Sequence, residues 1–173
     1  MFDPLLLLLD KMIRKAKVRR SRRHIRRRAR SIGEGLRING ESKVNDNTVI
    51  GNNVHFNGMK ILGSGRVRIG DNFHSGPGCE MITEIHNYDS GDRIPYDETY
   101  IPRDVVIESN VWLGSRVTIL GGVTIHEGAV IQAESVVVSD IPYCAVAGGN
   151  PARVFKMRDV EHYETLRSQG RFK

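Results

Sequence analysis

The chain of 173 residues is poor in aromatic side chains, in cysteine and in long apolar runs. Aromatic residues make up 6% of it, with a single tryptophan, whereas 18 glycines supply frequent tight turns. The apolar run at residues 5–9 is far shorter than the ~20 residues of a membrane-spanning helix, and it lacks the charge order of a secretory signal. These absences argue against export, a membrane span and a core built on large rings. They favour short strands joined by tight turns.

The two cysteines, Cys79 and Cys144, stand far apart and form no CxxC pair. Metal sites made of thiolates and redox dithiols use closely spaced cysteines, so the spacing argues against both. We expect two small, reduced and buried residues in a cytoplasmic protein. A nucleophilic Cys79 is the alternative, but no motif supports it.

Positive charge is concentrated at the N-terminal end of the chain. The formal net charge is +6, but residues 1–30 hold 12 Lys and Arg against two Asp and carry +10, which leaves −4 for the remainder. Asp3 suits a helix N-cap, Pro4 suits the first helical position, and Gly33 marks the end. The sequence therefore predicts a helix over residues 4–32, inside a basic, amphipathic arm of residues 1–40.

A period of six residues organises the chain from about residue 44 onward. Residues 107–142 form six consecutive units that begin with an aliphatic residue and carry a small or β-branched one four positions later. The units begin at Ile107, Leu113, Ile119, Ile125, Ile131 and Val137. Such a unit is a strand and a turn that cannot bury its own apolar side chain, so stacked coils must share a buried column. The period predicts a parallel β-helix rather than an antiparallel sandwich, whose turns recur about every 8–12 residues.

The repeat bounds a domain of residues 41–155 with one interruption. The earlier unit that begins at Ile69 is out of frame with Ile107, so extra residues must leave the helix between them. We place them in a protruding loop over residues 87–104, where Asp, Tyr, Gly and Pro gather. After Pro142 the repeat stops, and residues 156–173 are predicted to form a C-terminal helix and tail that cap the open end.

Several spaced motifs resemble the hexapeptide-repeat acyltransferases, in the branch of the maltose/galactoside O-acetyltransferases and xenobiotic acetyltransferases. The matching text is Asn110–Ser115, Gly122–Ile125, Ala147–Val154 and Thr83–Tyr88, followed by a loop. The resemblance implies a left-handed β-helix, which the periodicity itself does not establish. It also implies a homotrimer with active sites between subunits, acetyl-CoA as acyl donor and no required metal.

By this resemblance His86 is the general base that takes the proton of an acceptor hydroxyl, a task that suits an imidazole with a pKa near neutrality. Its position before the protruding loop agrees with that role but does not prove it. Only the family match separates His86 from the other histidines at hexapeptide positions, which are His55, His74 and His126. The group that orients the imidazole stays open among Glu84, Asp89 and Asp92.

The coenzyme contacts that the resemblance implies lie after the loop. Those residues are Gly114, Ser115, Ala133, Ser139, Arg153 and Lys156. The turn at Gly114 and Ser115 would also supply donors for the oxyanion, although a tight turn alone explains a glycine. Arg153 and Lys156 would meet phosphate groups. Relatives often carry Thr-Lys where this chain has Val138-Ser139, so one cation is missing here.

The acceptor side is less clearly marked. The resemblance places Trp112 beside the substrate groove and matches Asn57 loosely to an acceptor-binding asparagine, while Tyr88 and Asp89 stand at the start of the loop. A polar loop with several tyrosines suits a sugar. We therefore expect O-acetylation of a saccharide, such as a surface polysaccharide, a lipopolysaccharide or a sugar precursor. Xenobiotic or amino-sugar N-acetylation and a non-catalytic scaffold are the alternatives, and a zinc-dependent carbonic anhydrase is disfavoured because a second histidine is missing after His86.

The family resemblance does not explain the basic arm. Apolar residues followed by cations are typical of an interfacial helix on anionic lipid. We expect residues 1–32 to attach the protein loosely to the inner face of the cytoplasmic membrane. A solubilising tail that also caps the solenoid is the alternative. Nucleic-acid binding is not expected, because no aromatic residues are interleaved with the cations.

Overall fold

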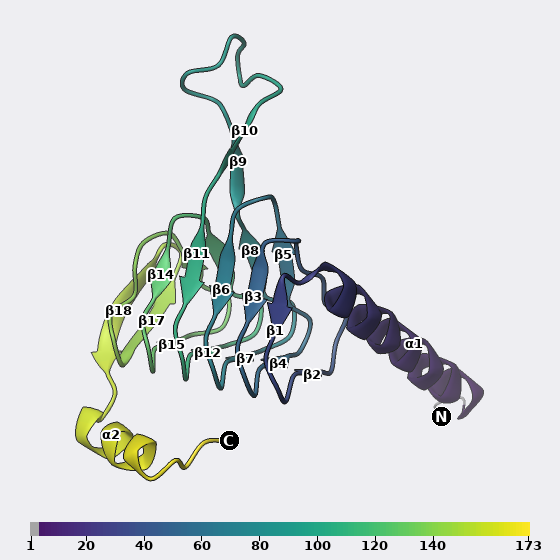
Figure 1. Ribbon diagram of the computed structural model, residues 1–173, viewed down its shortest axis with the longest axis vertical. Helices are drawn as coiled ribbons and strands as arrows, with labels where there is room; N and C mark the ends of the chain where they lie inside the picture. Colours follow the sequence, from purple (N-terminus) through teal and green to yellow (C-terminus); the bar gives the residue numbers. More distant parts are fainter. Residues whose placement is uncertain (1–3) are drawn as a thin grey trace.

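The protein is a left-handed parallel β-helix of about six coils with a helix near each end, seen in a computed structural model that describes residues 4–173 (Figure 1). The chain passes through sheet A, then sheet B, then sheet C, and repeats this order, so each sheet is one face of a triangular prism. The predicted fold class is confirmed.

The strands are short, and almost all pair in parallel with the coil before and after. Sheet A contains β1 (Ser31–Ile32), β3 (Thr48–Ile50), β6 (Val67–Ile69), β11 (Val105–Ile107) and β14 (Thr124–Ile125). Sheet B contains β2 (Arg37–Ile38), β4 (His55–Phe56), β7 (His74–Ser75), β12 (Trp112–Leu113), β15 (Val130–Ile131), β17 (Ala145–Gly149) and β18 (Ala152–Met157). Sheet C contains β5 (Lys60–Leu62), β8 (Glu80–Ile82), β13 (Thr118–Leu120) and β16 (Val136–Val137). The last strand, β18, turns back and pairs antiparallel with β17.

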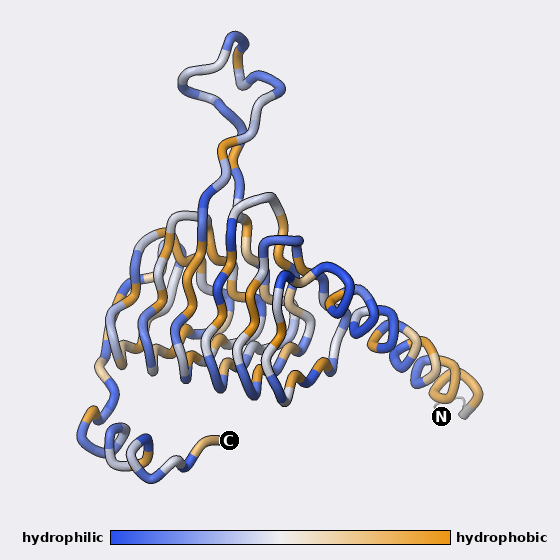
Figure 2. Tube along the Cα trace, viewed as in Figure 1, coloured by the Kyte–Doolittle hydropathy of each residue, from blue (hydrophilic) through white to orange (hydrophobic). Residues whose placement is uncertain are grey.

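The interior of the prism is the column of aliphatic side chains that the period predicts. All six unit-starting residues from Ile107 to Val137 are at most 1% exposed. Burying one such side chain contributes about 1.5–3 kcal/mol, so the column is a main source of stability. Figure 2 shows the result as hydrophobic and hydrophilic positions alternating along the coils.

Coils approach most closely at the corners, where glycine allows backbone to touch backbone. At Gly114 a Cβ atom would lie 2.5 Å from the backbone nitrogen of Ala133 and 2.8 Å from its Cα. The same crowding by the following coil is found at Gly33, Gly51, Gly70 and Gly76. The stacking alone therefore requires glycine at position 114, whatever else this residue does.

The N-terminal helix α1 (Pro4–Arg28) both projects from the body and closes its first coil (Figure 1). Ile25 is 0% exposed and packs into the core, while the hydroxyl of Ser21 accepts a hydrogen bond of 2.9 Å from the backbone of Ser42. The predicted N-cap, Asp3, lies outside the described residues. The helix ends at Arg28 rather than at residue 32, because the next residues form β1 and pair with β3.

The solenoid therefore begins about ten residues before the predicted boundary at residue 41. Ile32, Ile38 and Val44 already follow the period of six, but two of them fell inside the predicted arm of residues 1–40. Ile38 and Val44 are buried in the core, and Ile32 packs against it. The arm proper is α1 alone.

The C-terminal helix α2 (Val160–Ser168) lies along one corner of the prism instead of covering its open end (Figure 1). Residues 152–157, partly predicted as helix, form β18. The hydroxyl of Tyr163 holds α2 in place: it accepts a hydrogen bond of 2.9 Å from the amide of Asn110 and donates one of 3.0 Å to Glu127. The predicted capping role belongs to α1, because α2 finds its polar partners on the side of the coils.

The extra residues between Ile69 and Ile107 leave the helix as a stalk and loop (Figure 1). Strands β9 (Glu84–His86) and β10 (Tyr100–Pro102) pair antiparallel to form the stalk, and residues 87–99 form the loop at its tip. Ile69 and Ile107 are direct neighbours in sheet A, so the prism continues as though the insertion were absent. The predicted protrusion is confirmed, and its last part forms a strand.

The corner packing predicts the cost of Gly114→Ala. The added methyl group meets backbone atoms that cannot rotate away, so we expect the free energy of unfolding to fall by about 2 kcal/mol or more. Gly170→Ala is the control: nothing lies within 4 Å of the position that its added methyl group would take, and only its φ of +63° opposes a side chain. That change should cost about 1 kcal/mol. Urea unfolding measures both, and equal losses would contradict the crowding.

Candidate active site

His86 is the last residue of β9, on the stalk, and its ring is enclosed by tyrosines. The ring of Tyr96 stacks on it with centroids 3.9 Å apart, and the ring of Tyr100 lies 4.4 Å away. Tyr100 is also the register partner of His86 in the stalk. The imidazole is half-buried, and its Nδ1 atom is buried with no hydrogen-bond partner among the described residues. Two of the tyrosines predicted to line an acceptor wall therefore fix the histidine ring instead.

None of the three candidate carboxylates orients this imidazole. Glu84 accepts a hydrogen bond of 2.8 Å from the backbone of Ser64, and Asp92 lies 3.8 Å from Arg93. Within residues 4–173, no carboxylate is hydrogen-bonded to His86. Stacking, rather than an ion pair, holds the ring in the isolated chain.

The residues after His86 are open to solvent. Tyr88 is 68% exposed, and Asp89 is exposed beside it in the loop. Both were predicted to contact the acceptor, and both are accessible to a ligand that reaches the stalk.

A second group of predicted residues stacks along the corner between sheets B and C. Asn57, Gly114, Ser115 and Ala133 follow strands of sheet B in three different coils. The amide of Asn57 donates to the backbone of Ser75 at 2.7 Å and accepts from Asn39 at 3.1 Å, so both ends of this side chain serve the corner. The N–H of Gly114 donates to Ile131 at 2.8 Å. No hydrogen bond of the described chain uses the N–H or the hydroxyl of Ser115, which leaves this residue as the available donor in the turn.

Trp112 lies on the outer face of sheet B and is 56% exposed. Strand register aligns it with one outward column, which comprises His55, His74, Trp112, Val130, Val146 and Lys156. Arg153 lies on the same terminal strand as Lys156, and both are exposed. Five of the six predicted coenzyme residues thus lie on sheet B or at its corner. Ser139 follows β16 at the corner between sheets C and A, apart from the others.

One chain does not bring the two halves of the predicted site together. The stalk with His86 leaves the corner between sheets C and A, whereas Trp112 stands on sheet B. Figure 1 shows the stalk and α2 projecting from opposite sides of the prism. The geometry within one chain therefore offers a base and a groove on different surfaces.

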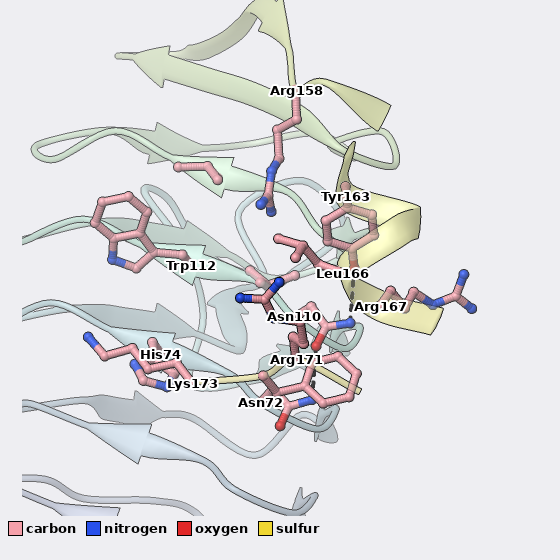
Figure 3. A pocket seen from close by; sticks show the side chains of 13 residues that line it. Asn72, His74, Asn110, Trp112, Arg158, Tyr163, Leu166, Arg167, Arg171 and Lys173 are labelled. Atoms are coloured by element: carbon pink, nitrogen blue, oxygen red, sulfur yellow. Dashed lines mark hydrogen bonds between the residues drawn. The ribbon is translucent and has the colours of Figure 1, made fainter. Parts of the chain in front are cut away.

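A cavity of about 570 Å³ separates sheet B from the C-terminal segment (Figure 3). Trp112 and His74 lie on the solenoid side, and Tyr163 and Leu166 come from α2. Sequence reasoning alone did not reveal this cavity, although Tyr163 and Arg167 stand at the four-residue spacing of one helix face. Burial, together with the charges of His55, Lys173 and Arg37, lowers the pKa of His74 to about 4.

The cysteines are buried and free, as predicted. Burial raises the pKa of the Cys79 thiol, and its Sγ atom donates to the backbone oxygen of Gly114 at 3.1 Å. Over residues 4–173, no group of three or more His, Cys, Asp or Glu side chains is placed to hold a metal ion.

Comparison with known proteins assigns the repeat. The family described as "Bacterial transferase hexapeptide (six repeats)" matches residues 104–139. The galactoside O-acetyltransferase of Escherichia coli is 36% identical over 121 residues, which are 68% of this chain and 59% of that protein. The chain spans just over half of the length of the curated relatives that it matches over 111 residues, 56% and 52% of them.

Solved structures extend the likeness to three dimensions. A hexapeptide-repeat containing acetyltransferase from Vibrio cholerae is 30% identical with a TM-score of 0.54, over 74% of this chain and 70% of that one. A galactoside acetyltransferase in complex with coenzyme A is 30% identical with a TM-score of 0.62, over 77% of this chain and 67% of that one. The six-residue period, the three-sided prism and these matches agree, and the chain belongs to the hexapeptide-repeat acetyltransferase family.

Proposed function

We propose that this protein transfers the acetyl group of acetyl-CoA to a hydroxyl group of a saccharide, with His86 as general base. The observation that carries the proposal is His86 itself, a half-buried imidazole held between tyrosine rings beside an open loop, on a scaffold of the acetyltransferase family. Similar solved structures include one complexed with acetyl coenzyme A and one with coenzyme A.

The chemistry requires a base and an oxyanion site. An alcohol is a weak nucleophile at neutral pH, so His86 would take the hydroxyl proton while the oxygen attacks the thioester carbonyl. The carbonyl electrons move onto oxygen, and they return as the bond to sulfur breaks and the CoA thiol leaves with the proton. The N–H of Gly114 is engaged within the coils, so Ser115 is our candidate donor to the oxyanion.

The residues on sheet B and at its corner fit a long donor with phosphate groups. Gly114, Ser115 and Ala133 present small side chains along one corner, which leaves room for a thin acyl-bearing arm. Arg153 and Lys156 are exposed on β18, and neither pairs with a carboxylate in the described chain, so both are free to meet phosphate. Ser139 lies at another corner, and we keep it as a candidate only for a neighbouring subunit's donor.

A homotrimer would join the two halves of the site. His86 and Trp112 lie on different sides of one prism, so the stalk of one subunit must meet sheet B of the next for both to reach one acceptor. Tyr88 and Asp89 are the exposed loop residues available to the acceptor. Asn57 is the weakest candidate, since its amide is already bonded at both ends.

Replacing the proposed base tests the mechanism. His86→Ala should lower the rate of thiol release from acetyl-CoA in the presence of acceptor about 10²–10⁴-fold, since the hydroxyl loses its base. His126→Ala is the matched control, because His126 also stands in a hexapeptide but lies near Glu108 on another corner. The assembly, measured by analytical ultracentrifugation, should remain trimeric in both variants. A His86→Ala enzyme with undiminished thiol release would assign the base elsewhere.

We further propose that α1 attaches the protein to an anionic membrane surface on the cytoplasmic side. Leu6, Leu7, Leu8 and Leu9 are all 48–60% exposed, and cations from Arg14 onward follow them. Consecutive leucines surround the helix, so apolar and basic residues separate along its axis rather than on two faces (Figure 2). This corrects the predicted amphipathic arrangement. No helix in residues 4–173 has both the length and the apolar character to cross a bilayer.

Because apolar and basic residues occupy different lengths of α1, we propose that its leucine-rich end, residues 5–13, enters the lipid. The basic residues from Arg14 onward would stay at the headgroups. Residues 5–13 rise about 14 Å, less than half of the ~30 Å hydrocarbon core, so the tip would reach one leaflet only. Each cation near an anionic surface contributes about 1 kcal/mol of attraction.

Vesicle sedimentation of the full-length protein tests the attachment. Arg19→Gln with Arg20→Gln should weaken binding to phosphatidylglycerol vesicles roughly 30-fold, and Leu7→Asn with Leu8→Asn should also release the protein. Both pairs lie before the packed residues Ser21 and Ile25, so the fold is kept. Arg68→Gln with Arg103→Gln, on the solenoid, is the charge-matched control and should bind like the wild type. Equal recovery of every variant in the pellet would contradict membrane attachment through α1.

A further inference from the structure

We propose that the C-terminal cavity, the space between sheet B and residues 158–173, binds a small organic anion that contains a ring. Its phosphate or carboxylate group would contact Arg171 and Lys173, and its ring would lie against Trp112. The cavity of about 570 Å³ is within the range of ligand pockets, roughly 300–1,000 Å³.

Every charged side chain that lines the cavity is positive. The four cations are Arg158, Arg167, Arg171 and Lys173. Arg158 extends into this space from the segment between β18 and α2, whereas the side chain of Arg167 on α2 points away from it (Figure 3). A concave surface with one sign of charge concentrates ligands of the opposite sign.

Two of these cations already have partners. Arg167 forms ion pairs with Glu127 at 3.0 Å and Glu164 at 2.7 Å, so its charge is largely neutralised. Arg158 donates to the backbone of Gly128 at 2.9 Å and lies over the ring of Tyr163. These two arginines therefore serve the wall of the cavity.

The other two cations are available to a ligand. Across residues 4–173, no carboxylate forms an ion pair with Arg171 or Lys173. The charge of Lys173 also acts on the solenoid wall, where it helps to lower the pKa of His74 and of His55. Positive potential thus extends across the cavity to sheet B.

His74 contributes hydrogen bonding rather than charge. Burial and the nearby positive charges lower the pKa of His74, which disfavours the imidazolium form, and its Nε2 atom is buried without a hydrogen-bond partner among the described residues. A neutral imidazole can donate or accept, which suits the hydroxyl groups of a sugar.

The remaining lining is apolar and suits a ring. Trp112 presents an exposed indole, and Leu166 and Phe172 face the cavity from the other side. The rings of sugars and nucleobases stack on such surfaces. An inorganic anion would make no contact with these apolar side chains. An anion that contains a ring would contact both them and the cations.

The corner of the solenoid beside sheet B and the C-terminal segment are joined before any ligand arrives. The amide of Asn72 donates to Asn110 at 2.9 Å, and Asn110 donates in turn to Glu127 and to Tyr163. The tail is also tied to the solenoid, since Asn53 donates to the backbone oxygen of Lys173 at 2.7 Å. A cavity held in this way loses little conformational entropy on binding.

The identification of this anion as the acetyl acceptor rests on the proposed function, whereas binding to the cavity does not. If both hold, the acceptor is a charged sugar, either a sugar phosphate or a sugar acid. The acceptor class then narrows from saccharides in general to negatively charged ones.

Trp112 is the only tryptophan of the chain, so its fluorescence reports the cavity directly. We would titrate the full-length protein with glucose 1-phosphate, glucuronate and the uncharged methyl glucoside. At least one charged sugar should give a saturable change with a Kd about 10-fold or more below that of methyl glucoside. The tighter of the two charged sugars distinguishes phosphate from carboxylate.

Charge variants test the named contacts. Arg171→Gln and Lys173→Gln should each weaken binding of the charged sugar about 10-fold, and they should leave methyl glucoside unaffected. Arg68→Gln, an exposed arginine on sheet A, is the matched control and should bind like the wild type. A silent tryptophan, equal binding of the neutral sugar, or variants with unchanged Kd would each overturn the proposal. Equal binding of coenzyme A with the same loss in the variants would assign the cavity to the donor and overturn the acceptor class.

Thiol release measured on the same proteins separates the two proposals. A saturable fluorescence change without thiol release would support anion binding in the cavity and contradict the proposed acetyltransferase activity. Thiol release with a neutral sugar, at a rate unchanged in Arg171→Gln, would support the proposed acetyltransferase activity. It would contradict the proposal that the cavity is the acceptor site.

Discussion

The hydrogen bonds from one coil to the next are the constraint on which the rest of this structure depends. A six-residue unit has neither enough apolar surface nor enough backbone partners to be stable alone. Each coil therefore donates to its neighbour, as Gly70 does to Ile107 and Gly114 to Ile131, both at 2.8 Å. This requirement brings the corners into backbone contact and explains the glycines there. It also leaves two ends of the stack to be closed.

The two ends are closed in different ways. At the first coil, α1 inserts Ile25 into the open prism and supplies polar partners from Ser21 and His24 to the backbone of residues 42 and 44. At the last coil, β18 turns back and pairs with β17, so sheet B ends in an antiparallel pair whose outer strand is β18. Neither helix supplies a strand to the three faces of the prism. The coils between them form a rigid frame on which the stalk, the loop and the C-terminal segment are placed.

The sequence predicted those parts of the fold in which one period dominates. From Ile107 to Val137 every unit start is buried, as expected, and the protruding loop was placed correctly because it had to absorb a shift of frame. The first coil was missed, since the arginines before it obscured the spacing of Ile32, Ile38 and Val44. The position of α2 was missed for another reason. It depends on hydrogen bonds between Tyr163, Asn110 and Glu127, which are distant in sequence and follow no period.

Site chemistry was less accessible to sequence reasoning than fold. The family resemblance singled out His86, but the rings that enclose it come from Tyr96 and Tyr100, whose roles depend on how the stalk pairs. The basic cavity joins residues from 72 to 173, and beyond the four-residue spacing of Tyr163 and Arg167 no local pattern links them. A single sequence does not show which distant segments contact each other.

The way in which α1 joins the first coil has a consequence for orientation. The same unbroken helix of 25 residues seals the first coil at one end and carries the leucines at the other. It is about 38 Å long and has no break between the two. The helix therefore couples its leucine-rich end rigidly to the solenoid, where Ile25 holds it. Whatever binds the leucine tip sets the height and tilt of the whole prism, and the direction in which the stalk faces.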